Sequence, residues 1–161
     1  FLDILLVNYD IHQLKAGRPC ILGGVHIESG LGPDGHSDAD VLIHALMDAM
    51  LGAAGLRDIG YYFPPEDDQY KGISSMLLLE KVNFLLKERG LQAYNIDIMV
   101  ISETPKLKPH IDMMKANLQS ILEIPLDRIS IKATTNEMLG AIGRREGIAA
   151  QAVVSVYEGE I

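Results

Sequence analysis

Cysteine is nearly absent from this sequence, since Cys20 is the single one among 161 residues. One cysteine cannot form an intrachain disulfide or supply a zinc site built from several thiolates, so a reducing compartment is the natural setting. We therefore expect the bacterial cytoplasm. The chain begins at Phe1 and not at methionine, so a removed targeting segment would no longer be visible, and a plastid-type organelle is the expectation if there was one.

Basic residues and long apolar runs are also scarce. Lys and Arg number 14 against 22 Asp and Glu, which gives a net charge of −8. A surface this acidic does not neutralise nucleic-acid phosphates, so no nucleic-acid partner is expected. No apolar stretch reaches the ~18 residues that span a bilayer, so no membrane partner is expected either. The length fits a single domain, residues 1–161.

Hydrophobic periodicity predicts strands interleaved with helices. The expected strands are residues 4–12, 19–27 with a bend at Gly23-Gly24, 94–101, 128–134 and 147–157. The expected helices begin at a cap on Ser37 or Asp38, at about residue 74, and at Pro109, with a short helical turn near Glu137. The stretch 56–73 is expected to form a long functional loop. The predicted fold class is α+β: a two-layer sandwich of a mixed β-sheet with three main helices on one face.

The stretch "DGHSDADVLIHALMDAML" raises the possibility of a metal site on the first helix. His44 lies inside the helical pattern, and Asp10 and His12 are two apart on a strand, which places both on one face. Two histidines and a carboxylate with an open fourth position are typical of catalytic zinc. Asp40 and Asp48, four residues either side of His44, could orient its ring. Taken alone, each histidine is more often an ordinary surface or satisfied residue, and these aspartates are more often helix-start or solvated charges.

Five stretches change that balance: "YDIH", "GHSDADVLIHALMDAMLGAAGLRDIGYYFP", "KGISS", "TPKLKPHI" and "IKATTNEMLGAIGRREGIAAQAV". Together, in this order and spacing, they resemble the 2-C-methyl-D-erythritol 2,4-cyclodiphosphate synthase family over residues 9–157. The resemblance implies a phosphorus-oxygen lyase that cyclises 4-diphosphocytidyl-2-C-methyl-D-erythritol 2-phosphate and releases CMP, in the non-mevalonate route to isoprenoids. The nucleophile is the substrate's own phosphate oxygen, which is consistent with a sequence lacking a P-loop or a Ser/His/Asp arrangement.

The resemblance also implies metal ligands and catalytic residues. The family's zinc triad falls on Asp10, His12 and His44, and its second divalent cation, Mg²⁺ or Mn²⁺, falls on Glu137. The positions that stabilise the transition state by hydrogen bonds to phosphate fall on His36 and Thr135. Without the resemblance, these last two would be interpreted as a loop histidine and a strand-end threonine.

Substrate-binding positions are implied in the same way. Those that match the family are Ser37, Asp58, Ile59, Gly60, Phe63 and Asp67 in the sugar-side loops, Ser102, Thr104, Pro105, Lys106, Leu107 and Lys108 in the cytosine pocket, Ala133, Thr134, Thr135 and Asn136 around the diphosphate, and Ala141 and Arg144. In isolation the same loops would be interpreted as ordinary turns and a solvated basic segment.

The family is a homotrimer with active sites between subunits, so we expect a neighbouring chain to complete this site. Arg144 and Glu146 match positions near the threefold axis, where a central cavity can accept isoprenoid diphosphates. A charged turn before the last strand explains these two residues equally well.

The sequence departs from the family in three places. The usual "RIGxG" opening is replaced by residues 4–8, "ILLVN", which could shift the strand end that carries Asp10. Ala141 stands where many members have an aromatic residue, and Asn136 where threonine is common. Two other functions therefore stay open: a zinc phosphohydrolase, which would activate water, and a non-catalytic trimer that binds isoprenoid diphosphates.

Overall fold

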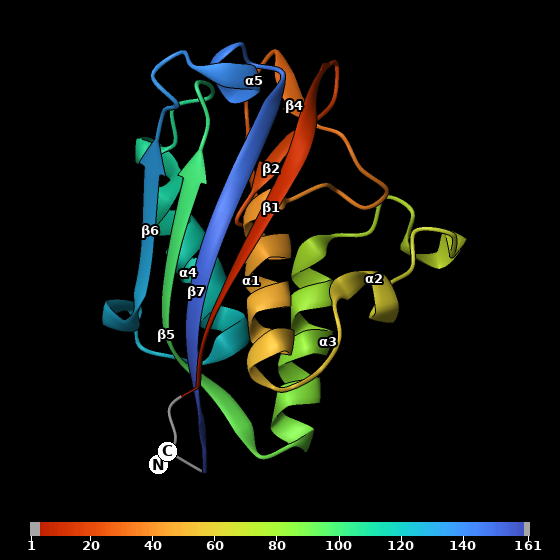
Figure 1. Ribbon diagram of the computed structural model, residues 1–161, viewed down its shortest axis with the longest axis vertical. Coiled ribbons are helices and arrows are strands. Elements are labelled where there is room, and N and C mark those ends of the chain that lie inside the picture. The colour runs from red at the N-terminus through yellow and green to blue at the C-terminus, as the bar shows by residue number, and fades with distance from the viewer. Residues whose placement is uncertain (1–3, 160–161) are drawn as a thin grey trace.

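The computed structural model describes residues 4–159 and consists of one sheet, a small hairpin and a helical layer (Figure 1). The strands are β1 (Ile4–Ala16), β2 (Cys20–Leu22), β3 (Val25–Ile27), β4 (Leu31–Pro33), β5 (Leu91–Ile101), β6 (Ile129–Thr134) and β7 (Gly147–Glu158). The helices are α1 (Val41–Ala53), α2 (Ile59–Tyr62), α3 (Ser75–Glu88), α4 (Ile111–Leu122) and α5 (Gly140–Gly143). Residues 1–3 and 160–161, which the predicted single domain includes, lie outside the described residues.

The main sheet has five strands in the order β4-β1-β7-β5-β6. β5 and β6 pair in parallel, and among the described residues the other neighbouring strands pair antiparallel, so the sheet is mixed as predicted. The three longer helices α1, α3 and α4 lie on one side of it (Figure 1). The predicted α+β sandwich is therefore confirmed.

Strand β1 shows why Asp10 and His12 point the same way. Its even-numbered residues from Leu6 to Leu14 are partly or fully buried, whereas its odd-numbered residues are exposed, as the two-residue period of a strand requires. The even side faces the helices, and Leu6 packs against the apolar core there. The odd side leaves Leu5, Val7, Tyr9 and Ile11 between 50% and 64% exposed on the open face of the sheet.

The unusual residues 4–8 do not disturb this strand. β1 pairs with β7 without interruption from Ile4 opposite Val156 to Gln13 opposite Gly147. Gly52 of α1 leaves room for the bulkier side chain at position 6, because a Cβ at Gly52 would lie 3.2 Å from Leu6 Cδ1. The expected shift of the strand end is therefore not found, since the ladder stays in register through Asp10 and His12.

Helix α1 is the central element of the core. All of its residues are buried except Asp48 and Gly52, because it lies between the sheet and α3. Its N-cap is Asp40, whose side chain accepts a hydrogen bond from the amide of Ile43, and not Ser37 or Asp38 as predicted. The "SDAD" stretch offers three good capping residues, and the turn at Ala39, with φ of 58°, brings the last of them to the helix end.

Three other predicted elements need correction. Residues 19–27 form a hairpin of β2 and β3, because Gly23 and Gly24 both have positive φ and make a tight turn where a bend was expected. The predicted loop 56–73 contains α2 and a 3₁₀ turn at Asp68–Tyr70. The helical turn expected near Glu137 is α5, which begins at Gly140.

Candidate metal centre and substrate pockets

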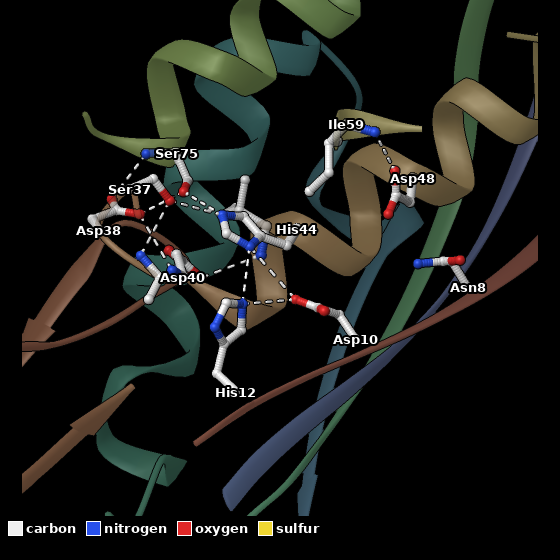
Figure 2. A network of polar contacts seen from close by, with 12 residues as sticks. Asn8, Asp10, His12, Ser37, Asp38, Asp40, His44, Asp48, Ile59 and Ser75 are labelled. Atoms are coloured by element: carbon white, nitrogen blue, oxygen red, sulfur yellow. Dashed lines mark hydrogen bonds and ion pairs between the residues drawn. The ribbon is translucent and has the colours of Figure 1, made fainter. Parts of the chain in front are cut away.

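Asp10, His12 and His44 converge from β1 and α1 on one point (Figure 2). His44 follows the capping residue by four positions, so it points from the first turn of α1 towards β1. The distance from His12 Nε2 to His44 Nδ1 is 3.1 Å, and Asp10 Oδ2 lies 3.0 Å and 3.5 Å from these two nitrogens. Among residues 4–159, this is the group of three potential metal ligands that the structure brings together.

The hydrogen bonds around this triad leave two acceptor atoms, His12 Nε2 and Asp10 Oδ2, without a hydrogen-bond donor among the described residues. His12 Nδ1 lies 2.8 Å from the carbonyl oxygen of Asp34, and because a carbonyl only accepts, Nδ1 carries the proton. In the neutral ring, His12 Nε2 therefore presents a lone pair to the centre of the triad. Asp10 Oδ2 is buried and receives no hydrogen bond from the described residues. A buried convergence of acceptors is favourable when a cation lies between them, so the residues fit a divalent metal ion.

Electrostatics within the triad point the same way. Burial raises the pKa of Asp10, but contacts with His12 and His44 outweigh burial and hold that pKa well below its usual range. Burial lowers the pKa of His12, yet its close contact with the Asp10 carboxylate and its hydrogen bond to the Asp34 carbonyl raise that pKa overall. The carboxylate thus stays ionised, and protons compete with a metal ion for the imidazole.

The outer nitrogen of His44 lies between two hydroxyl groups. Nε2 is 3.1 Å from Ser37 Oγ and 3.0 Å from Ser75 Oγ (Figure 2). The predicted orienting residues do not reach this ring in the described structure. Asp40 accepts hydrogen bonds from the amides of Gly23, Gly24 and Ile43, and Asp48 accepts one from the Ile59 amide at 2.7 Å.

A cavity of about 170 Å³ opens beside His44. Its lining includes His36, which was predicted as catalytic, and the predicted sugar-side residues Ser37, Ile59, Gly60 and Phe63, together with Pro65, Tyr70 and Leu78. His36 Nε2 donates to the Asp67 carbonyl at 3.2 Å, and Asp58 caps α2 through the Tyr61 amide at 2.9 Å. Pro65, Tyr70 and Leu78 were not predicted, since apolar residues in a loop and a helix carry no chemical signature.

A second cavity, of about 250 Å³, lies where β5 and β6 end. It is lined by Val100, Ser102, Glu103, Pro105, Lys106, Leu107, Lys108, Ala133, Thr134 and Thr135, most of them predicted for the cytosine and diphosphate. Ser102 Oγ donates to the carbonyl of Thr104, which fixes the loop. Glu103 was missed: its Oε1 accepts from the amides of Asn136 and Met138 at 2.9 Å and 3.0 Å, so it ties the two loops together.

The remaining predicted residues lie in the turn before α5, in α5 and directly after it. Glu137 accepts a hydrogen bond from Thr135 Oγ1 at 3.1 Å, and both residues are exposed. Arg144 forms an exposed ion pair with Glu146 at 2.7 Å. Within this chain, Glu137 is not a member of the Asp10–His12–His44 group, and the two cavities have no lining residue in common.

This fold and this site define a class of α+β protein: one mixed sheet with helices on one face and a candidate cation site of carboxylate and imidazole between sheet and helix. The chain belongs to the YgbB family, whose model matches residues 7–157. A 2-C-methyl-D-erythritol 2,4-cyclodiphosphate synthase of Synechococcus elongatus is 59% identical over 146 residues, which are 91% of each chain. One of Thermosynechococcus vestitus is 57% identical over 94% of each chain.

Solved structures agree with the sequence comparison. The bifunctional IspDF of Campylobacter jejuni matches with a TM-score of 0.95 and 41% identity, over 99% of this chain and 43% of that longer one. IspF of Plasmodium falciparum, solved as a CDP complex, matches with a TM-score of 0.86 and 30% identity over 98% and 97% of the two chains. The predicted family is therefore confirmed. No helix among the described residues has the length and hydropathy to cross a membrane.

Proposed function

We propose that this chain cyclises 4-diphosphocytidyl-2-C-methyl-D-erythritol 2-phosphate to 2-C-methyl-D-erythritol 2,4-cyclodiphosphate, with release of CMP, at a zinc centre of Asp10, His12 and His44. The lyase activity follows from the family and from the name that its relatives share. The identity of the metal, the roles of individual residues and the assembly are our inferences. The observation that carries the metal assignment is the convergence of acceptor atoms in the partly buried triad.

The reaction needs positioning and positive charge more than a protein nucleophile. The attacking oxygen is already anionic on the substrate, so the protein must align it with the β-phosphorus and stabilise charge on the phosphates. A zinc ion in the triad would supply a Lewis acid for a phosphate oxygen. His36 lies in the wall of the cavity that also contains His44, so its ring can be directed at a phosphate once substrate competes with the Asp67 carbonyl.

The second cavity is suited to the cytidine end of the substrate. Its lining includes residues of the 102–108 loop, among them the cationic residues Lys106 and Lys108. We assign Glu137 to a second divalent cation, Mg²⁺ or Mn²⁺, for which the substrate phosphates would provide further oxygen ligands. Thr135 holds the Glu137 carboxylate at 3.1 Å, and it would give up this bond to contact a phosphate.

Two features support a trimer with shared active sites. The cavities for the two ends of the substrate are separate within one chain, so a complete site needs the first cavity of one subunit to face the second cavity of another. The open face of the sheet exposes Leu5, Val7, Tyr9 and Ile11 in a row, and an apolar row of this kind is typical of an association surface. The homotrimer of the sequence prediction remains a proposal.

The test removes one ligand and compares it with a histidine outside the site. His44→Ala should lose zinc and nearly all cyclase turnover while keeping a cooperative melting transition, because a metal ligand is removed and the core of α1 stays packed. His26→Ala, in the exposed part of β3, is the matched control and should keep both. Turnover by His44→Ala without zinc would contradict the assignment.

A further inference from the structure

A buried serine links the metal centre to a carboxylate on a different loop. Ser75, the first residue of α3, is fully buried, and its hydroxyl lies 3.0 Å from His44 Nε2. The same hydroxyl is hydrogen-bonded to Asp38 Oδ1 at 2.5 Å, and the Ser75 amide donates to Asp38 Oδ2 at 2.9 Å (Figure 2). Sequence reasoning gave neither Asp38 nor Ser75 a role at the site.

The direction of these hydrogen bonds follows from what each group can do. A carboxylate only accepts, so the single hydroxyl proton of Ser75 goes to Asp38. The Ser75 oxygen can then only accept from His44, and Nε2 must carry the proton. If Nε2 instead carried a lone pair, the Ser75 oxygen and Nε2 would face each other at 3.0 Å as two acceptors whenever the Ser75 proton goes to Asp38.

We propose that Asp38 and Ser75 are positioning residues that lock His44 in the Nε2-protonated tautomer and so direct its Nδ1 lone pair at the metal. The proposal rests on the proposed zinc centre. Nδ1 is the His44 atom that faces Asp10 and His12, so the lock matches the direction in which the ring must bind. Histidine ligands generally depend on such a partner for orientation and basicity.

Ser37 does not fix the tautomer by itself. Its oxygen also lies 3.1 Å from His44 Nε2 and accepts a bond from the Ala39 amide at 3.3 Å. Its hydroxyl proton has no carboxylate acceptor among the described residues, so it can point towards Nε2 or away from it. The two serines therefore differ in that the Ser75 hydroxyl donates its proton to the Asp38 carboxylate, which leaves the Ser75 oxygen as an acceptor only.

A purely structural role for Ser75 makes different predictions. Asp38 also holds the start of α3 through the Ser75 amide, and this bond survives in Ser75→Ala. Ser74, the N-cap of α3, provides a matched control, because its hydroxyl accepts from the Met76 amide and has no bond to His44. Loss of helix capping alone would affect Ser74→Ala at least as much as Ser75→Ala.

The first experiment measures the zinc dissociation constant of the metal-free full chain by competition with a chromophoric chelator. Ser75→Ala should bind zinc roughly 10- to 100-fold more weakly than the parent, and Ser74→Ala should bind it equally. Asp38→Asn should also weaken binding, because its amide group can donate to Ser75 Oγ and free the serine proton to point at Nε2. Parent-like zinc affinity in both Ser75→Ala and Asp38→Asn would overturn the proposal.

The second experiment needs no variant. Long-range proton–nitrogen correlation of the metal-free parent, at a pH where the imidazoles are neutral, distinguishes the two tautomers of His44. A proton on Nε2 supports the lock, and a proton on Nδ1 overturns it even if a variant fails to fold. A parent chain that binds no zinc would instead contradict the proposed function, so the two failures can be told apart.

Discussion

The Asp40 side chain ties the β2–β3 turn to the start of α1, the helix that carries His44, and replacing it by asparagine should reduce stability. Its Oδ1 accepts from the amides of Gly23 and Ile43, and its Oδ2 accepts from Gly24 at 2.8 Å. In Asp40→Asn the side-chain NH₂ group would best take the position of Oδ2. There only the Gly24 amide loses its acceptor, whereas at the Oδ1 position the amides of both Gly23 and Ile43 would lose theirs. Leaving that backbone N–H without an acceptor should cost about 1–3 kcal/mol of unfolding free energy.

The raised pKa of Asp40 also makes the free energy of unfolding depend on pH, in a direction that can be worked out. Burial raises the pKa of Asp40 from 3.8 to about 6, against the opposing hydrogen bond from Gly24. Between these values the folded chain binds more protons than the unfolded chain, so this group stabilises the fold as pH falls. With 3.8 for the unfolded chain, the gain from about pH 7 to about pH 5 is about 1.4 kcal/mol.

Asp40→Asn cannot titrate, so it should lose about 1.4 kcal/mol more stability relative to the parent at about pH 5 than at about pH 7. Urea denaturation at both pH values, at one protein concentration, measures this double difference and cancels the other titrating groups. Asp112→Asn, at an exposed position in the first turn of α4, is the control and should show no such difference. An equal loss at both pH values, or a larger loss at the higher one, would refute the reasoning.

Three further predictions concern the site. Gly35→Ala should weaken zinc binding on the order of 10-fold, because its Cβ would lie 3.1 Å from His12 Cε1, whereas Gly30→Ala, with open space around it, should not. Zinc affinity, measured by competition titration, should fall as pH decreases through the raised pKa of His12, and a flat profile would contradict that ligand. Lys81→Ala should raise KM about 2- to 5-fold with little change in kcat, since the ammonium group lies 5.3 Å from the Tyr70 ring that lines the first cavity; an unchanged KM would show that this contact does not hold the loop.

Local patterns predicted the parts of the site that depend on one element. Two-residue spacing placed Asp10 and His12 on the same side of β1, and helical periodicity placed His44 on α1. These patterns raised the triad as one possibility, and the family resemblance was needed to prefer it. Contacts between distant segments could not be predicted in this way. Ser75 is 31 residues from His44, and only the packing of α3 against α1 brings its hydroxyl to the ring.

The choice of helix cap and the contacts of the turns could not be predicted from local sequence patterns either. The neighbouring residues Ser37, Asp38 and Asp40 are all good caps, and the choice among them depends on the hairpin turn whose amides Asp40 binds. Glu103 was missed because its role is to accept two backbone amides from a turn 33 and 35 residues away. Burial and long-range hydrogen bonds, not residue type, identify such groups.

The most direct test of the central claim is a phosphorus NMR time course with 4-diphosphocytidyl-2-C-methyl-D-erythritol 2-phosphate, Zn²⁺ and Mg²⁺, repeated after chelation. We predict signals of a cyclic diphosphate and CMP that disappear when the metals are removed and return when zinc is restored. A linear diphosphate or free phosphate would indicate a phosphohydrolase, and unchanged substrate with zinc confirmed in the protein would favour a non-catalytic binding protein. Either result would contradict the account.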